Sequence, residues 1–208
     1  MMDVTVIVAT YGSKEWEKLG DEALESIKNI GSNTHRIHLK SGSLAQARNK
    51  ALKEVTTKYV CFLDADDTLT KDYFNFKPKA DITVTKIRYR GFGAGKIPKV
   101  WQHEHNESKK HEGNCKGECL LDGNWVHIGA IMKTAVAKRV KFREYPVYED
   151  YAYFLEQYLN GATFGISDSL YQASIRQSPG HRNQSLPLTK RNKIHFQIYK
   201  DITDNEWS

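Results

Sequence analysis

Residues 59–67 read Tyr-Val-Cys-Phe-Leu-Asp-Ala-Asp-Asp, so a short apolar run leads directly into three carboxylates. An apolar run of this kind predicts a strand buried on both faces, as in parallel sheets. Open α/β sheets bind ligands at the carboxyl ends of such strands. Three acids this close repel one another, and a divalent cation with oxygen ligands relieves the repulsion and can bridge to phosphate. The stretch therefore predicts a metal-dependent site for a phosphorylated ligand. An acidic turn that caps the next helix is the alternative.

The composition is that of a soluble globular protein. The 208 residues suffice for one domain with a proper core, and 39% of them are hydrophobic against 27% charged. No run reaches the roughly 20 apolar residues of a membrane span, and the N-terminus carries no basic region typical of a signal peptide. Three cysteines, an odd number, do not indicate a secreted disulfide framework. We therefore expect a cytoplasmic protein, with peripheral attachment to a membrane left open.

Strands and helices alternate over the first 70 residues. The β-branched run at residues 4–9 predicts a second buried strand, and residues 36–39 predict a weaker one. Residues 13–30 have helical apolar spacing, and Ser43 is placed as the N-cap of another helix that runs to Val55. This alternation implies right-handed crossovers between parallel strands. The predicted fold class is α/β, with a mostly parallel central sheet flanked by helices.

The second part of the chain is less regular. A helix is predicted over residues 149–159, and residues 91–123 have no clear period and predict a long loop or insertion. The other expected elements are a short helix at 70–76, a strand at 81–89, a strand and then a helix within 126–140, short strands at 163–166 and 170–175, and a final helix at 188–202.

Several of these features, in this order, resemble the family 2 glycosyltransferases of the GT-A fold. The features are Ala9-Thr10-Tyr11, the helix at 45–52, Phe62-Leu63-Asp64-Ala65-Asp66-Asp67, Glu149-Asp150 before Leu159-Asn160-Gly161, and His181. The resemblance implies a GT-A nucleotide-diphospho-sugar transferase fold and inverting transfer of a sugar from a nucleotide donor to an acceptor hydroxyl. It also implies a single domain over 1–208. Within it, a donor-nucleotide half spans about 1–90, an insertion about 91–123, an acceptor half about 124–185 and a C-terminal helix about 186–208.

The resemblance also assigns the acidic stretch. Asp64 and Asp66 match the pair that contacts the donor ribose and a Mn²⁺ or Mg²⁺ ion, with Asp66 favoured as the metal ligand and Ala65 between them at the donor. Such an ion offsets the charge that builds on a leaving diphosphate. Asp67 has two open interpretations, direct contact with the ligand and capping of the following turn.

Asp150 is the candidate general base, with Glu149 as the alternative. Inversion needs one group that removes the acceptor proton as the oxygen attacks. A carboxylate in the first turn of a helix is held rigidly and is favoured by the helix dipole. The same position suits an acid that serves only stability, so the interpretation depends on the resemblance.

Four residues match positions near the donor nucleotide: Thr10, Tyr11, Arg48 and Asn49. A guanidinium such as that of Arg48 can bind a phosphate or a base carbonyl. His181 matches a position at which some relatives place a further contact to the metal or the diphosphate, and a solvated loop histidine is the alternative.

One departure concerns the nucleobase. Many relatives follow the second strand with an acidic segment that reads the base, whereas residues 39–43 here read Leu-Lys-Ser-Gly-Ser and contain no acid. A UDP-sugar is favoured as the donor, but the base stays open.

Two other functions use residues of the same chain. Asp64 begins a D-x-D-x-T pattern similar to that of haloacid-dehalogenase-type phosphatases, in which the first acid attacks phosphorus. A zinc-stabilised binding module without catalysis could use residues from the insertion, namely His103, His105, His111, Cys115 and Cys119.

The net charge of +6 permits an acidic partner. Basic residues cluster at Lys133, Lys138, Arg139, Lys141 and Arg143, and again at Lys190, Arg191 and Lys193. They suggest an anionic acceptor, such as a cell-surface glycan or lipid precursor or a nucleic acid, with a solvated basic face as the alternative. The sequence does not specify the acceptor or the oligomeric state.

Overall fold

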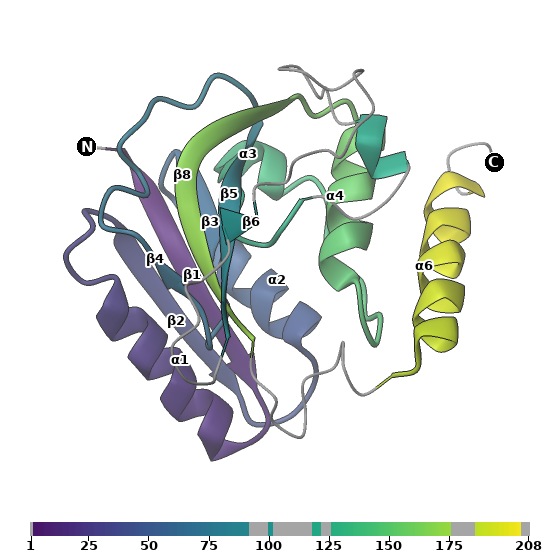
Figure 1. Cartoon of the computed structure of the whole chain (residues 1–208), viewed down its shortest axis with the longest axis horizontal. Coiled ribbons are helices and arrows are strands. Elements are labelled where there is room, and N and C mark those ends of the chain that lie inside the picture. The colour runs from purple at the N-terminus through teal and green to yellow at the C-terminus, as the bar shows by residue number, and fades with distance from the viewer. Residues whose placement is uncertain (1, 92–99, 102–117, 122–125, 176–185, 205–208) are drawn as a thin grey trace.

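The structure is a computed structural model that describes residues 2–91, 100–101, 118–121, 126–175 and 186–204. Its strands belong to one curled, mixed sheet with helices packed against it (Figure 1). Strands from the first 90 residues and from residues 126–175 are hydrogen-bonded within this sheet, so one core serves both parts of the chain.

The N-terminal part forms as predicted. β1 (Val4–Tyr11) lies between β2 (Asn33–Leu39) and β3 (Tyr59–Phe62), and both pairings are parallel. The crossovers are α1 (Lys14–Ser26) and α2 (Leu44–Glu54), both of which contact β1 and β2. Ser43 is the N-cap of α2, because its hydroxyl accepts a hydrogen bond from the amide of Gln46 at 3.1 Å. β1 and β3 are apolar and buried because neighbours cover both of their faces.

The remaining strands complete the sheet. β5 (Ile82–Gly91) runs parallel to β8 (Phe164–Ile175), and β7 (Ile131–Lys133) joins β5 to β3 through antiparallel pairs. β4 (Thr68–Leu69) pairs with β8, and β6 (Val100–Trp101) pairs with β5. The order is β2-β1-β3-β7-β5-β8-β4, with β6 off this path. The longest ladders are parallel and the antiparallel ones are short, so the predicted fold class is confirmed.

Two local expectations were wrong. Residues 71–74 form turns instead of a helix, because the fully buried Tyr73 donates its hydroxyl to the Gly129 carbonyl at 2.6 Å and is fixed by tertiary contacts. The two short strands expected at 163–175 are one strand, β8, whose ladder absorbs a register shift between Thr85 and Lys86 of β5. Most of the expected loop or insertion at 91–123 lies outside the described residues, and the described part of it includes β6 and a 3₁₀ turn, η1 (Glu118–Leu121).

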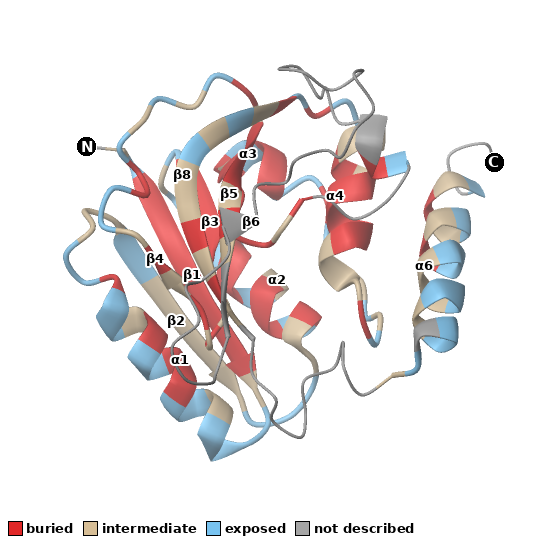
Figure 2. Cartoon of the chain, viewed as in Figure 1, coloured by how far each residue is buried: buried red, intermediate tan, exposed pale blue. Residues whose placement is uncertain are grey.

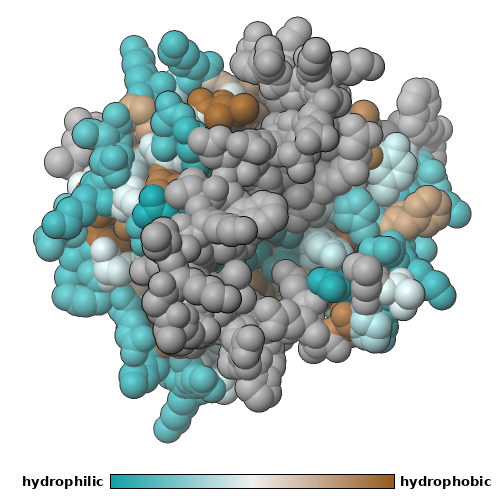
Figure 3. All heavy atoms as spheres, viewed as in Figure 1, coloured by the Kyte–Doolittle hydropathy of each residue, from teal (hydrophilic) through white to brown (hydrophobic). Residues whose placement is uncertain are grey.

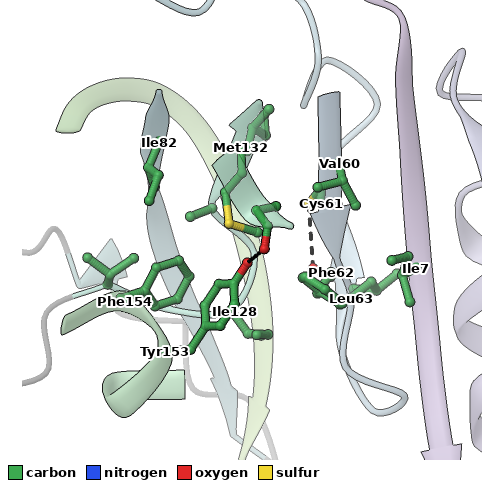
Figure 4. Close-up of a cluster of buried hydrophobic side chains, with 14 of the residues drawn as sticks. Ile7, Val60, Cys61, Phe62, Leu63, Ile82, Ile128, Met132, Tyr153 and Phe154 are labelled. Atoms are coloured by element: carbon green, nitrogen blue, oxygen red, sulfur yellow. Dashed lines mark hydrogen bonds between the residues drawn. The ribbon is translucent and has the colours of Figure 1, made fainter. Parts of the chain in front are cut away.

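Aromatic packing joins the sheet to the helices of the second part. Phe62 of β3 meets Phe142 edge to face at 5.1 Å between ring centroids, and Phe142 stacks on Tyr153 at 4.0 Å. Tyr153 belongs to α4 (Glu149–Leu159), which has the predicted bounds, and its hydroxyl donates to the last residue of α3 (Thr134–Ala137). Figure 4 shows Phe62 and Tyr153 among the buried hydrophobic side chains of the core, and Figure 2 shows that burial follows the same elements.

The C-terminal helix α6 (Leu188–Thr203) packs outside α4 (Figure 1). His195 stacks on Tyr151 at 4.2 Å and meets Tyr148 edge to face at 5.7 Å, while Ile198 and Ile202 are buried. The described part of the face in Figure 3 is mostly hydrophilic with small apolar patches. Among the described residues, no helix combines the length and the apolar character needed to cross a membrane.

Candidate active site

A cavity of about 200 Å³ opens at the carboxyl ends of β1 and β3. It lies where the parallel part of the sheet delivers its strand ends, as expected for a ligand site in an open α/β sheet. The lining residues come from β1, α1, α2, the turn after β3 and the start of α4, and they are Ala9, Thr10, Tyr11, Trp16, Leu44, Arg48, Asp64, Ala65, Asp66, Val147, Tyr148, Glu149 and Asp150. Most of the residues predicted for the site therefore lie around one cavity.

The acidic stretch is a tight turn. The amide of Asp67 donates to the carbonyl of Asp64 at 3.0 Å, which is the hydrogen bond of a four-residue β-turn. Ala65 and Asp66 occupy the two central positions, and Asp64, Ala65 and Asp66 line the cavity. The Asp64 side chain is 38% exposed. The turn thus presents two carboxylates to the cavity, from its first and third residues.

Arg48 is the central cation of the site. Its side chain is only 3% exposed, and it donates from Nη2 to Asp64 at 2.7 Å and from Nη1 to Glu149 at 3.0 Å. The guanidinium also lies 5.2 Å from the centroid of the Phe142 ring. Burial acts to lower the pKa of Arg48, but the nearby acids Asp64, Glu149 and Asp150 outweigh it and the pKa is raised. Arg48 therefore stays charged and joins the acidic turn to the start of α4.

The two acids at the start of α4 differ in their surroundings. Glu149 is 13% exposed and is paired with Arg48. Asp150 accepts a hydrogen bond from the amide of Tyr151 at 2.8 Å, and burial and then the neighbouring charge of Glu149 raise its pKa to about 6. A carboxylate with a pKa near neutrality holds a proton well enough to act as a general base. Burial and the charge of Glu149 thus give Asp150 a property that a general base needs.

Asp67 has a structural partner that neither sequence interpretation included. It is buried, it accepts hydrogen bonds from the Tyr171 hydroxyl at 2.7 Å and from the amide of Ser174 at 2.6 Å, and it does not line the cavity. Burial and the charges of Asp64 and Asp66 raise its pKa well above the ordinary value. Both carboxylate oxygens of Asp67 thus accept hydrogen bonds from β8, so the structure places this side chain against β8 and not as a cap of the turn through Thr68 and Leu69.

Asn49 requires a correction. Its side chain donates to the carbonyl of Phe142 at 2.8 Å and accepts from the amide of the same residue at 2.9 Å. Asn49 is absent from the cavity lining. Both polar atoms of its amide hold the chain that leads to α4. The structure therefore places this side chain against Phe142 and away from the cavity in which a nucleotide contact was expected.

Thr10 and Tyr11 end β1 at the cavity, as predicted. The Thr10 hydroxyl accepts a hydrogen bond from Arg36 at 2.8 Å and lies 3.0 Å from Nδ1 of His38, so β2 fixes its orientation. Sequence reasoning missed Trp16 and Tyr148, which also line the cavity. The sequence offered a clue to both: Trp16 follows Tyr11 closely, and Tyr148 directly precedes Glu149 and Asp150.

Tyr148 has an unusual backbone. Its φ of 64° is in the left-handed region, and it is the only non-glycine residue with positive φ among the described residues. An L-residue pays roughly 1–2 kcal/mol for this conformation, and such strain is concentrated at functional sites. The residue directly precedes Glu149, so its conformation sets the direction from which the two acids enter the cavity.

Two predicted ligand groups fall outside the described residues. His181 is one of them. For the proposed zinc set, His103, His105, His111 and Cys115 lie outside the described ranges, and of Cys119 only the backbone, in η1, is described. Within the described ranges, no three His, Cys, Asp or Glu side chains gather closely enough to hold a metal ion by themselves.

The acidic turn nevertheless fits a divalent cation that is shared with a ligand. Mg²⁺ in nucleotide sites is commonly held by one or two carboxylates together with substrate phosphates, and not by an all-protein cage. Asp64 and Asp66 supply two carboxylates at the cavity, and the contact from Arg48 is to Oδ1 of Asp64. This donor set suits Mg²⁺ or Mn²⁺ bound to a diphosphate.

Most of the basic residues before α4 have structural partners. Lys133 is paired with Asp81 at 2.9 Å, and Arg143 with Glu156 at 3.0 Å. Lys138 donates to the carbonyls of Lys53 and Val55 at the end of α2. These contacts give the cluster a role in the fold, so it no longer argues by itself for an anionic acceptor.

A sequence profile of the family described as "Glycosyl transferase family 2" matches residues 17–139, which is more than half of the chain. The match includes Arg48 and the acidic turn and ends before Asp150. No curated protein matches the sequence.

Solved structures share the fold at low identity. S. aureus TarS, residues 1–349, in complex with UDP-GlcNAc is 18% identical, with a TM-score of 0.61 over 95% of this chain and 65% of that chain. The mannosyltransferase PcManGT from Pyrobaculum calidifontis, in complex with GDP-Man and Mn²⁺, is 15% identical, with a TM-score of 0.57 over 94% of this chain and 63% of that chain. The chain thus spans less than two thirds of the length of either protein.

Proposed function

The chain belongs to glycosyl transferase family 2, and from this we propose that it transfers a sugar from a nucleotide-sugar donor to an acceptor hydroxyl with inversion at the anomeric carbon. The observation that carries the proposal is Arg48, which is buried between Asp64 of the acidic turn and Glu149 beside Asp150. This single side chain would join the part of the cavity that holds the diphosphate to the part that holds the candidate base.

The donor would bind across the strand ends. Tyr11 and Trp16 offer aromatic faces to the nucleobase, and the acidic turn lies beside them for the ribose and the diphosphate. Asp64 and Asp66 would hold Mn²⁺ or Mg²⁺, with Asp66 the stronger candidate because Arg48 already engages Asp64. When bound, the cation would offset the negative charge of the leaving diphosphate.

The acceptor side would rely on Asp150. At pH above about 6 its carboxylate is ionised and can take the proton of an acceptor hydroxyl. Glu149 keeps its ion pair with Arg48 and raises the pKa of Asp150 through its charge.

The nucleobase is a matter for experiment. One structural neighbour is described with UDP-GlcNAc and another with GDP-Man. A UDP-sugar remains the first donor to test, and a GDP-sugar the second. The absence of an acid in residues 39–43 means that any discrimination between them would come from other groups, such as Thr10 with its partners Arg36 and His38.

The proposal is tested by thermal denaturation with UDP-sugars and GDP-sugars in the presence of Mn²⁺. A ligand at about 100 times its dissociation constant adds about 2.7 kcal/mol to the free energy of unfolding, so a true donor raises the melting temperature clearly. EDTA and Asp66→Ala should each abolish the rise. Asp168→Asn is the control, because Asp168 is 93% exposed on β8 and its ion-pair partner among the described residues is Lys86, which does not line the cavity. If no nucleotide sugar raises the melting temperature with Mn²⁺, the proposal is wrong.

A further inference from the structure

Tyr171 holds the acidic turn from behind. It lies on β8, its side chain is 1% exposed, and it is not part of the cavity lining. Its hydroxyl accepts a hydrogen bond from the amide of Asp64 at 3.2 Å and donates one to Oδ2 of Asp67 at 2.7 Å. We propose that Tyr171 is a positioning residue, which fixes the turn at residues 64–67 so that Asp64 and Asp66 face the donor and its cation. This inference rests on the proposed function for what the turn binds.

The contacts reach both ends of the turn. Asp64 is its first residue and Asp67 its last, and the two are already joined by the hydrogen bond between the Asp67 amide and the Asp64 carbonyl. A phenolic hydroxyl has one proton to donate and can also accept, so one Tyr171 side chain serves both residues at once. The amide of Ser174 adds a third contact, to Oδ1 of Asp67 at 2.6 Å. The central residues Ala65 and Asp66 are thus held by groups of β8 that do not enter the cavity.

The ring of Tyr171 is itself tightly placed. His127 lies against it at 4.8 Å between ring centroids, and Tyr73 meets it edge to face at 6.5 Å. Gly129 leaves the space that the ring occupies, because a Cβ added there would lie 2.2 Å from Cδ2 of Tyr171. Any larger residue at position 129 would push the ring away from the turn. The glycine at position 129 therefore leaves the space that allows the Tyr171 hydroxyl to reach the turn.

The arrangement matters for binding as well as for stability. Groups that orient metal ligands from behind typically change metal affinity by about 10-fold to 100-fold when they are removed. Carboxylates in a turn have few contacts of their own to fix them, and sites on loops are less exact than sites on strands unless supporting bonds hold them. Here β8 supplies that support, and it does so from residues 107 positions away in the sequence.

The test compares Tyr171→Phe with a matched variant, Tyr73→Phe. Both tyrosines are fully buried and each hydroxyl makes two hydrogen bonds, those of Tyr73 being to Thr85 at 2.7 Å and to the Gly129 carbonyl at 2.6 Å. Both variants should melt at a lower temperature than the wild type. Only Tyr171→Phe should also weaken binding of Mn²⁺ and a nucleotide sugar, by about 10-fold or more in calorimetry. Tyr171→Phe with the affinity of the wild type would overturn the inference.

A second measurement does not depend on the ligand. Hydrogen exchange of the Asp64 amide, followed by NMR, should be slow in the wild type and in Tyr73→Phe and much faster in Tyr171→Phe. Fast exchange in the wild type, or no change in Tyr171→Phe, would contradict the inference even if that variant folds poorly. Should the wild type bind no nucleotide sugar, the proposed function fails, while the exchange data still decide whether Tyr171 holds the turn.

Discussion

Replacing Asp150 by asparagine separates the proposed role of this carboxylate as a general base from its cost to the stability of the fold. Burial and the charge of Glu149 raise its pKa from an ordinary 3.8 to about 6. At about 1.36 kcal/mol per pH unit, that difference corresponds to about 3 kcal/mol against the ionised form in the folded state. The side chain stands at the wall of an open cavity, where solvent screens part of this, so we expect about 1–2 kcal/mol.

The sign follows from the protons bound in each state. Between pH 3.8 and about 6 the folded protein holds the Asp150 proton more tightly than the unfolded chain, so this group's contribution to stability falls as the pH rises through that range. Asp150→Asn removes the effect and keeps a side-chain oxygen for the amide of Tyr151. The variant should therefore be more stable than the wild type by about 1–2 kcal/mol at pH 8, and the difference should shrink towards pH 4.

Urea denaturation at several pH values measures the stability, and sugar transfer measures the activity. The expected result is a variant that binds the donor, unfolds at higher urea than the wild type at pH 8, and no longer transfers the sugar. Asp168→Asn, which removes an exposed acid, should leave both properties unchanged. A variant less stable than the wild type at pH 8 would refute the electrostatic reasoning. Preserved turnover would refute the assignment of the base.

Three further predictions concern the same cavity. Arg48→Met should lower the free energy of unfolding by about 3 kcal/mol in urea, because two carboxylates lose their buried counter-charge; a loss below about 1 kcal/mol would mean that they do not depend on it. Asn49→Ala should cost about 1–3 kcal/mol by the same measurement, since it leaves the amide and carbonyl of Phe142 without their side-chain partner. Its donor affinity in calorimetry should stay within about twofold of the wild type, and a larger change would restore the nucleotide contact. The logarithm of kcat/KM should rise with pH below about 6 and level off above it, as Asp150 loses its proton; a flat profile down to pH 4 would contradict its role as base.

Local signals predicted the elements whose stability is local. Ser43 precedes α2 and accepts from its first turn as an N-cap does, and the helical spacing of residues 149–159 gave the bounds of α4. The continuous apolar runs of β1 and β3 identified buried parallel strands. The expected helix at 70–76 failed because Tyr73 is fixed by Thr85 and Gly129, and contacts across that distance leave no trace in local spacing.

The residues of the site likewise divide into those with a local sequence signal and those placed by contacts distant in the sequence. Asp64, Asp66 and Asp150 were found because each belongs to a short pattern beside a predicted strand end or helix start. The role of Asn49 was misjudged because its position on α2 looks the same whether the side chain meets a ligand or Phe142. Tyr171 escaped notice altogether, since only the folded sheet brings β8 behind the acidic turn.

The contacts of α2 limit how members of this fold can be recombined. Gln46, Arg48 and Asn49 all hydrogen-bond to residues of the segment 142–149, far along the chain. An exchange of residues 1–90 with the corresponding part of another member of the family would keep the strands but break the hydrogen bonds between α2 and segment 142–149. Residues 1–90, which carry most of the proposed donor site, are therefore not an interchangeable module here. A working hybrid would need segment 142–149 from the same parent as its α2.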